Sequence, residues 1–208
     1  HAMSRRQRQM CIRDRNKGYE VVTAFVDTGT SSENEIQEIE GKALKLGAKK
    51  HYNLDASDLL WEEFVVPLLH SGAMYQGQYP LLCSDRYLIV KLCLQLCDEI
   101  GSNIFAHGCT AMGNDQVRFD QTVRCLGEYE IIAPIRELQD RGGDIRAFEI
   151  EQLQNAGHEV KLEHKRYSIN ENILGITWSG SEIDEFQMPA VDALSLIHIS
   201  EPTRQHWI

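Results

Sequence analysis

The stretch that decides the fold is "NIFAHGCTAMGNDQVRFDQTVRCL", residues 103–126. Its short apolar start predicts a strand over 103–108, and the run from Asn114 to Leu126 has the pattern of a helix. A polar loop with glycines joins the two. Ligands of parallel α/β sheets bind beyond the carboxyl ends of the strands, so this loop is a candidate site.

The alternation of strand and helix continues on both sides of this stretch. "YEVVTAFVD" (19–27) is apolar and rich in β-branched residues, which is typical of a buried strand. Ser32 and Glu35 then fit a capping box at the start of a helix that Gly47 would end. The further predicted elements are a strand over 49–55, a helix over 57–74 with a kink or break at Pro67, a helix over 86–100, a strand over 129–135 and a helix over 144–157. This order predicts an α/β fold, a parallel sheet with helices on both faces.

The composition is that of an ordinary globular protein and excludes some classes of function. Of the 208 residues, 42% are apolar and 25% charged, and no apolar run approaches the roughly 20 residues of a membrane span. The formal charge of −10 argues against a nucleic-acid surface. Six cysteines show neither a CxxC pair nor zinc spacing, so we expect a reduced, cytoplasmic protein. Cys93 and Cys97 share a helix face, where core packing is favoured over metal binding.

The two ends differ in character from the rest of the chain. "HAMSRRQRQMCIRDR" (1–15) is basic, and "LSLIHISEPTRQHWI" (194–208) is unrelated to what precedes it. Both resemble translated adapters of sequencing libraries, and the first three residues resemble a cloning scar. We therefore expect non-native tails at 1–15 and 194–208. Without the six arginines and two acids of these tails, residues 16–193 carry a net charge of −14, which leaves no basic arm for nucleic acid.

The loop at 106–120 combines residue types that suit a small polar ligand. Gly108 permits close approach of a ligand to the backbone, and Thr110 and Asn114 offer neutral hydrogen bonds. Asp115 would pair with a ligand amine, and Arg118 with a carboxylate. Free backbone N–H groups at the helix start favour an anion. The alternative from the same residues is a capped, solvated first turn in which Asp115 only serves the helix dipole.

Other polar residues have weaker patterns. His107 alone is more often a hydrogen-bonded strand-end histidine than a catalyst. Tyr79 and Ser84 flank Pro80 and could contact a polar ligand, but a helix-entry turn with a packed tyrosine is favoured from the residues alone. The run "KRYSINENILGITWSG" (165–180) is either a loop over a ligand or a solvated loop. The triplet Asp-Thr-Gly at 27–29 has no second copy, and the strand–helix pattern around it excludes an aspartic protease.

Five motifs together resemble the argininosuccinate synthase family. They are "KALKLGAKK", "YPLLCS", "AHGCTAMGNDQVRFD", "IIAPIRE" and "YSINENILG", in family order and at near-family spacing from residue 16 to about 180. The GNDQVRF element is the most specific of them. The resemblance implies an adenine nucleotide alpha-hydrolase-like fold of the ATP-pyrophosphatase type over 16–160, followed by the start of a synthetase domain over 161–193.

The resemblance implies an ATP-dependent carbon–nitrogen ligase of arginine biosynthesis. That family joins citrulline and aspartate into argininosuccinate and releases AMP and pyrophosphate. The citrulline ureido oxygen attacks the α-phosphate of ATP, and the aspartate amine then displaces AMP. Magnesium is expected on the phosphates, and the full-length family member is expected to be a homotetramer, without nucleic-acid or membrane partners.

The resemblance also assigns binding roles to residues that match the family motifs. It carries over neither a catalytic residue nor a metal ligand. The implied contacts are Tyr79, Ser84, Asn114, Arg118, Ser168 and Thr177 for citrulline, Thr110, Asn114 and Asp115 for aspartate, and Val26 and Gly108 for the nucleotide.

The sequence departs from the family pattern in several places. In the family, a phosphate loop, SGGLDTS, is expected before Lys17, and further binding and oligomerisation regions are expected after Ala193. In this sequence the adapter-like tails stand at both places instead. Thr177 stands where the family usually has serine, Ala111 where it frequently has glycine, and Cys109 where it has a small residue. We therefore expect an inactive fragment. The alternatives are another ATP-pyrophosphatase, tRNA-thiolating or amidating, or a non-catalytic nucleotide-binding domain. Those other ATP-pyrophosphatases would lack the HGxTxxGNDQ run, and the ones that bind tRNA usually need a basic surface.

Overall fold

The computed structural model describes residues 12–74, 77, 82–111, 113–139, 150–151, 154 and 168–179. The chain divides into two compact units, one of residues 1–161 with 172–174 and the other of residues 162–171 with 175–208. Each unit is treated by itself below. The predicted helix over 144–157 lies outside the described residues except at 150, 151 and 154, which are helical.

The first unit begins with a strand–helix–strand motif, which matches the sequence prediction. β1 (Val22–Asp27) pairs in parallel with β2 (Lys50–Asp55), and α2 (Glu33–Lys45) connects them. The predicted capping box at the start of α2 is confirmed. Ser32 accepts from the Glu35 N–H through Oγ at 3.3 Å, and Glu35 accepts from the Ser32 N–H at 2.9 Å. The buried face of α2 carries Ile39 and Ala43, and this face makes the helix cover the strand pair.

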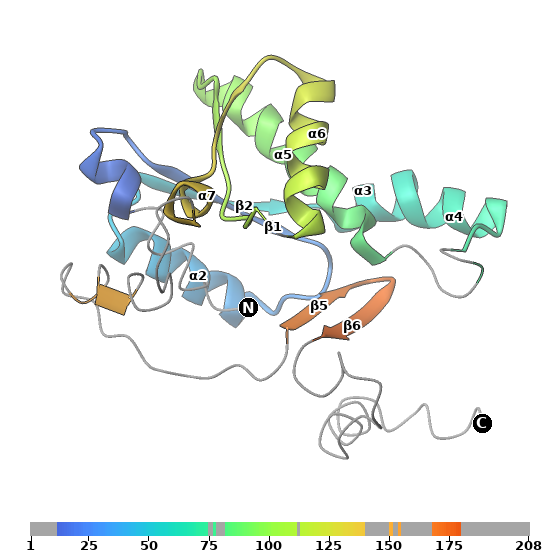
Figure 1. Cartoon of the computed structure of the whole chain (residues 1–208). Helices are drawn as coiled ribbons and strands as arrows, with labels where there is room; N and C mark the ends of the chain where they lie inside the picture. Colours follow the sequence, from blue (N-terminus) through green and yellow to red (C-terminus); the bar gives the residue numbers. More distant parts are fainter. Residues whose placement is uncertain are drawn as a thin grey trace. The chain divides into compact units, whose positions relative to one another are not determined.

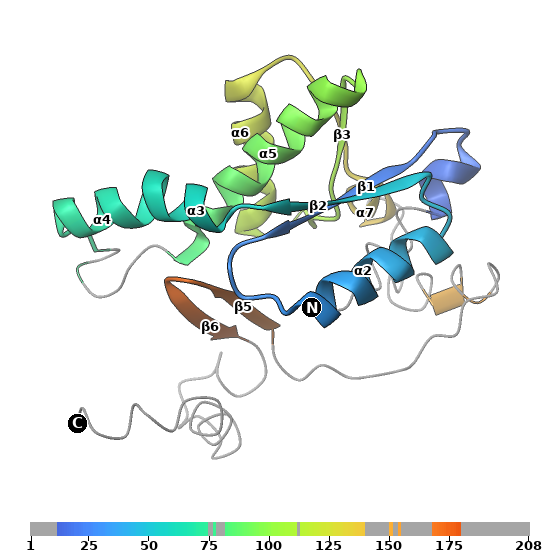
Figure 2. The ribbon, with the colours of Figure 1, turned by 180° about the vertical axis from the view of Figure 1, so that it is seen from behind.

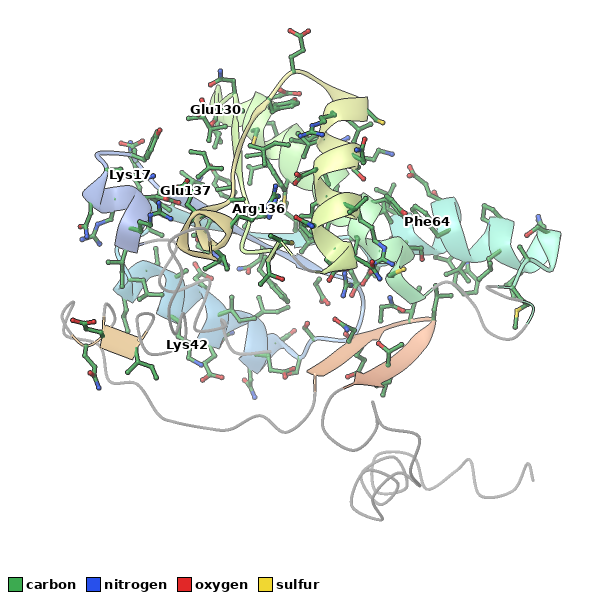
Figure 3. All side chains as sticks on the ribbon, viewed as in Figure 1. Lys17, Lys42, Phe64, Glu130, Arg136 and Glu137 are labelled. Carbon is green, nitrogen blue, oxygen red and sulfur yellow. The ribbon has the colours of Figure 1, made fainter. Side chains whose placement is uncertain are left out.

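The predicted break at Pro67 takes the form of a widened helical turn. α3 (Ser57–Leu60) continues into a π-helical turn, η1 (Trp61–Val65), and then into α4 (Val66–Ser71). Proline has no N–H to donate one turn back, and the helix widens where that bond would form. Gly72 ends α4 with a left-handed φ of 60°. Phe64, labelled in Figure 3, stacks on the Tyr87 ring of the next long helix, with 6.3 Å between centroids.

The core of the first unit forms where the central helices meet the second strand pair. After a short turn, η2 (Leu82–Ser84), the chain continues through α5 (Asp85–Ile100), β3 (Ile104–Ala106), α6 (Asn114–Leu126), β4 (Glu130–Ile132) and α7 (Pro134–Gln139). Gly101 ends α5 with a φ of 71°. α5 packs along α6 (Figure 1). The buried side chains of Val90, Leu94, Phe105 and Val123, from α5, β3 and α6, form one hydrophobic cluster.

The four parallel strands form two hydrogen-bonded pairs rather than one continuous ladder. β1 pairs with β2, and β3 with β4, both in parallel; within the described residues no backbone ladder links the two pairs. α5 contacts both β1 and β3, and so joins the pairs through side chains. α2 and α5 lie on opposite faces of the β1–β2 pair (Figures 1 and 2). The predicted α/β class and parallel direction are thus confirmed, whereas the sheet is divided.

A helical turn at residues 12–16 precedes β1, inside the stretch that we expected to be a tail. Arg13 donates to the carbonyl of Pro134 at 2.7 Å and pairs with Glu137 of α7, which also lies 3.3 Å from Lys17 Nζ. Lys17 and Glu137 are neighbours in Figure 3. The tail boundary at residue 15 stays a prediction.

The second unit contains most of a β-hairpin. β5 (Ser168–Asn172) pairs with β6 (Gly175–Ser179). The turn is fixed by Asn172 Oδ1, which accepts the Leu174 N–H at 2.9 Å, and by Gly175 with a φ of 140°. The boundary of a synthetase domain at residue 161 stays a prediction. Among the residues that the structure describes, no helix is long and apolar enough to cross a membrane.

Candidate functional site

The loop between β3 and α6 presents backbone groups rather than a side-chain cap. Gly113 is the N-cap of α6 and provides no side-chain acceptor for the N–H groups of the first turn. A Cβ added to Gly108 would meet nothing within 4 Å, so space lies beside the backbone there. The predicted features of an anion-accepting loop, an open glycine and a 13-residue helix behind it, are therefore present.

Four charged residues connect the starts of α5 and α6, and we call them the Asp115 cluster: Asp85, Arg86, Asp115 and Arg118. Arg118 Nη1 donates to Asp115 Oδ1 at 2.8 Å, and Arg86 Nε lies 3.7 Å from Asp115 Oδ2. Arg86 Nη1 also donates to Asp85 Oδ2 at 2.6 Å. The Asp115 side chain is 44% exposed, so it is held between two guanidinium groups and still faces outward.

Two buried polar atoms at the start of α5 lack partners among the described residues. Ser84 is 4% exposed and Asp85 2% exposed. Neither Ser84 Oγ nor Asp85 Oδ1 has a hydrogen-bond partner there. Ser84 precedes α5 with helical backbone angles and makes no capping bond. A buried polar atom without a partner costs roughly 1–3 kcal/mol, so these atoms mark a place where a ligand can stabilise the fold.

The Asp115 cluster is chemically complementary to a free amino acid. An α-amino acid carries an ammonium and a carboxylate, and Asp115 and Arg118 offer the opposite charges side by side. Burial alone would lower the pKa of Arg118, but its hydrogen bond to Asp115 and nearby negative groups raise the pKa overall. Arg118 is therefore fully charged at neutral pH, as recognition of a carboxylate requires.

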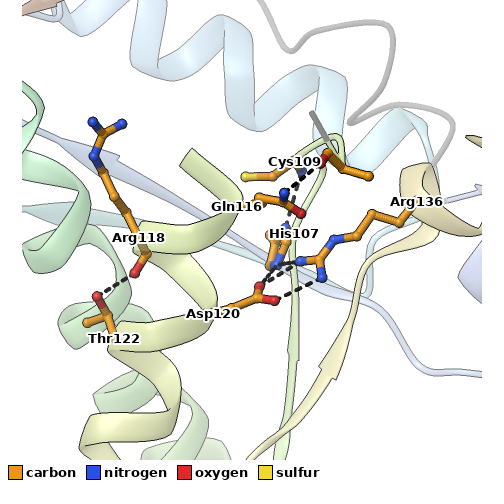
Figure 4. Close-up of polar contacts among 8 residues, drawn as sticks. His107, Cys109, Gln116, Arg118, Asp120, Thr122 and Arg136 are labelled. Atoms are coloured by element: carbon orange, nitrogen blue, oxygen red, sulfur yellow. Dashed lines mark hydrogen bonds and ion pairs between the residues drawn. The ribbon is translucent and has the colours of Figure 1, made fainter. Parts of the chain in front are cut away.

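A second cluster, the His107 cluster, lies on the inner side of α6 and consists of His107, Asp120 and Arg136. Arg136 makes a two-pronged contact with the Asp120 carboxylate, Nη1 to Oδ2 at 2.8 Å and Nη2 to Oδ1 at 2.6 Å. His107 Nε2 lies 2.9 Å from Asp120 Oδ1, and the Cys109 N–H donates to His107 Nδ1 at 3.2 Å. Figure 4 shows these side chains meeting on one side of α6, with Arg118 directed to another. The interpretation of His107 as a hydrogen-bonded strand-end histidine is confirmed.

Burial and neighbouring charges determine the protonation states in the His107 cluster. Burial lowers the pKa of His107, and the Arg136 charge lowers it further, against the opposing effect of Asp120. Burial would raise the pKa of Asp120, but the hydrogen bonds and charges of Arg136 and His107 lower it overall. The Cys109 thiol has a pKa of about 11 because of burial and of nearby Asp115, so it is protonated and inert.

Sequence comparison identifies the family. Residues 9–153 match the Arginosuccinate synthase N-terminal HUP domain. The chain belongs to the argininosuccinate synthase family. Argininosuccinate synthase of Xanthomonas campestris pv. campestris is 50% identical over 177 residues, 85% of this chain and 45% of the relative. The enzyme of Xylella fastidiosa is 49% identical over 179 residues (86% and 45%), and that of Methanocaldococcus jannaschii 42% over 169 residues (80% and 41%). The chain thus spans less than half the length of these relatives.

The structure brings some of the residues implied by the family together at the starts of α5 and α6. Asp115 and Arg118 belong to the Asp115 cluster, Ser84 borders it, and Asn114 is exposed at the first position of α6. Thr110 lies in the loop before it, half-buried. The argininosuccinate synthase fold accounts for this meeting, because α5 and α6 pack side by side.

The structure leaves other implied residues apart or undescribed. Val26 is half-buried near the carboxyl end of β1. Thr177 is half-buried in β6 and belongs to the second unit. Tyr79 lies outside the described residues, and of Ser168 only the backbone, in β5, is described.

Sequence reasoning missed the inner partners of the site: Asp85, Arg86, Asp120 and Arg136. One signal was available for Asp120. It lies three residues before the fully buried Val123, so both are on the core face of α6, where an unpaired acid would be unfavourable. No comparable signal pointed to Arg136, which reaches Asp120 from α7.

Proposed function

We propose that this chain is the nucleotide- and amino-acid-binding part of an ATP-dependent ligase that joins citrulline and aspartate into argininosuccinate, with release of AMP and pyrophosphate. The observation that carries the proposal is the Asp115–Arg118 pair, 2.8 Å apart at the start of α6, beside an open glycine loop. Family membership supports it, because each of the relatives named above is called argininosuccinate synthase.

The two amino acids would bind around the starts of α5 and α6. Aspartate would contact Thr110, Asn114 and Asp115, whose carboxylate suits the ammonium group. Citrulline would contact Asn114 and Arg118, with the buried Ser84 Oγ as a further hydrogen-bonding group. The resemblance to the family also implies citrulline contacts for Tyr79, Ser168 and Thr177.

The nucleotide would lie along the carboxyl ends of β1 and β3, against Val26 and Gly108. The open space beside Gly108 suits close approach of a ligand to the backbone. Magnesium would accompany the phosphates, since Mg²⁺ at such sites is usually bound by substrate phosphates and one or two carboxylates. Among the described residues, no group of three or more His, Cys, Asp or Glu could hold a metal ion.

The protein would contribute mainly positioning and charge. Holding the citrulline ureido oxygen near the α-phosphate, and the aspartate amine near the ureido carbon, makes both steps effectively unimolecular. Fixed N–H groups and guanidinium groups would stabilise the negative charge that develops.

Calorimetry with the chain tests this proposal. L-citrulline, L-aspartate and ATP with Mg²⁺ are titrated separately and together. Binding of both amino acids is expected, with Asp115→Asn reducing aspartate binding. Binding of ATP without either amino acid would indicate a nucleotide-binding domain, and binding of tRNA instead would indicate another ATP-pyrophosphatase. For the full-length protein we propose a homotetramer, which sedimentation would test.

A further inference from the structure

The loop that carries the proposed ligand contacts is tied to the ring of the histidine before it. The Cys109 N–H donates to His107 Nδ1 at 3.2 Å. The backbone N–H of His107 donates to the carbonyl of Ile132, the last residue of β4, at 3.0 Å. His107 thus has its backbone fixed to β4 and its ring fixed to the loop. It is also 4% exposed, so water does not replace these contacts easily.

The neighbours of the ring leave one arrangement of its proton. A backbone N–H only donates, so Nδ1 must accept from Cys109 and carries no hydrogen. A carboxylate only accepts, so Nε2 carries the hydrogen and donates it to Asp120 Oδ1 at 2.9 Å. Arg136 Nη2 is also 2.9 Å from Nε2, but its shorter contact, at 2.6 Å, is the hydrogen bond that it donates to Asp120 Oδ1. The neutral ring therefore satisfies Cys109 and Asp120 together.

We propose that His107 is a positioning residue, which in its neutral form with the hydrogen on Nε2 holds the backbone at 108–111 in its ligand-binding conformation. The choice of ligand rests on the proposed function, whereas the hold on the loop does not. The groups facing the ring are Asp120 from α6, Arg136 from α7 and Cys109 from the loop, with the rings of Phe105 and Phe119 around them.

Protonation of His107 would release the loop. The imidazolium has a hydrogen on Nδ1, which would then face the Cys109 N–H, and two donors cannot bond to each other. The new charge would also lie beside the Arg136 guanidinium. Burial and Arg136 lower the pKa of His107, which keeps the ring neutral at physiological pH. The backbone at 108–111 should therefore be held at neutral pH and released in acid.

NMR of the free protein tests the hold on the loop without any ligand. Ring ¹⁵N signals of His107 should report the Nε2–H form at about pH 7.5, above the ordinary histidine pKa of about 6.5. On acidification, the Cys109 amide should shift and exchange faster with the same midpoint as the ring. A ring with its hydrogen on Nδ1, or a Cys109 amide that does not follow the ring, would overturn the proposal.

Two substitutions separate the hold on the loop from the contact with Asp120. The Oδ1 of His107→Asn can occupy the place of Nδ1 and accept from the N–H two residues on, as asparagine commonly does. The amide of His107→Gln can reach Asp120 instead and leaves Cys109 without its acceptor. We expect L-aspartate to bind about fivefold more weakly to His107→Gln than to His107→Asn, which is the effect of one net hydrogen bond.

Aspartate is a suitable probe because its own groups do not titrate between neutral pH and about pH 5. Aspartate binding to the unmodified chain should weaken about fivefold below the pKa that NMR gives for His107, and this loss should be absent in His107→Asn. His51→Asn is the matched control, since His51 is also buried and hydrogen-bonded but lies in β2. It should retain the pH dependence of aspartate binding.

The outcomes distinguish the two proposals. If the ring and the Cys109 amide titrate together but aspartate does not bind at any pH, the hold on the loop stands and the proposed function fails. If aspartate binds with equal affinity to both His107 variants and without the acid loss, the positioning role fails and the proposed function stands. Should neither variant fold, the NMR titration of the unmodified chain decides.

Discussion

The two charged clusters on α6 differ in how far the carboxylate at the centre of each is buried and paired within the protein. In the His107 cluster the Asp120 carboxylate receives hydrogen bonds from both Arg136 and His107. In the Asp115 cluster the Asp115 side chain is 44% exposed, and the buried Asp85 Oδ1 and the neighbouring Ser84 Oγ lack partners among the described residues. One helix thus carries a closed cluster that fixes the fold and an open one that can accept a ligand. Charge alone does not distinguish them, and neither does full pairing, because the buried Arg136 Nε also lacks a partner among the described residues. The exposure of the two carboxylates does: the Asp120 side chain is 12% exposed and the Asp115 side chain 44%.

The strongest way to break this contrast is Asp120→Ala. Removing the carboxylate leaves Arg136 and His107 without their partner, and breaking a buried ion pair costs about 3 kcal/mol or more. Urea unfolding should show a correspondingly lower free energy of unfolding. Asp115→Ala is the matched control: its side chain is exposed enough that unfolding should change by less than about 1 kcal/mol. Equal losses in the two variants would contradict the distinction.

Asp115→Asn should have the opposite profile, with binding lost and stability kept. An amide cannot pair with an ammonium group, and a charge-assisted hydrogen bond of this kind accounts for about 30-fold in affinity. Calorimetry with L-aspartate measures the loss, and circular dichroism during heating checks that the fold is unchanged. An unaltered affinity would remove Asp115 from the proposed site.

The pH dependence of stability should come from the closed cluster. The pKa of His107 is lowered in the folded state, so the unfolded chain binds more protons as pH falls below about 6.5. Its contribution to stability is therefore present above that pH and is lost as pH falls toward the folded-state pKa. Asp120 has a lowered pKa as well, and its contribution is lost only below about pH 4.

Urea unfolding at several pH values between about 7.5 and 5 measures this effect. His107→Asn should make the free energy of unfolding depend less steeply on pH. His51, whose pKa burial also lowers, would account for a remaining slope. A slope that His107→Asn leaves unchanged would mean that His107 is not buried as a neutral ring.

Gly108→Ala should have the smallest effect on the free protein. The added Cβ meets nothing within 4 Å, so unfolding should change by less than about 0.5 kcal/mol. AMP binding, in contrast, should weaken roughly tenfold, because a methyl group would displace the ligand from the backbone. Gly41→Ala in α2 also adds a Cβ in open space and should leave AMP binding intact.

Local signals in the sequence predicted most elements of the fold. Ser32 and Glu35 marked the start of α2, and Gly47 its end, because caps depend on a few neighbouring residues. Pro67 marked a disturbance but not its form, a π-helical turn. The division of the strands into two pairs was not predicted, since pairing depends on contacts between distant segments.

The candidate site was predicted in part for the same reason. Asp115 and Arg118 are neighbours on one helix, so their pairing follows from a spacing of three residues. Arg86 and Arg136 come from α5 and α7, and only the packing of those helices brings them to α6. Sequence motifs indicated where the site lies, but not which side chains surround it.

The division into strand pairs has a consequence for how the chain folds. Val22 pairs with Lys50, and Ile104 with Glu130, so each pair closes a loop of fewer than about thirty residues. Each pair also has its own connecting helix, α2 or α6, and is a complete β–α–β unit. Each unit can therefore nucleate independently, at similar entropic cost. α5 contacts a strand of each, so we expect its docking to join the two units late in folding.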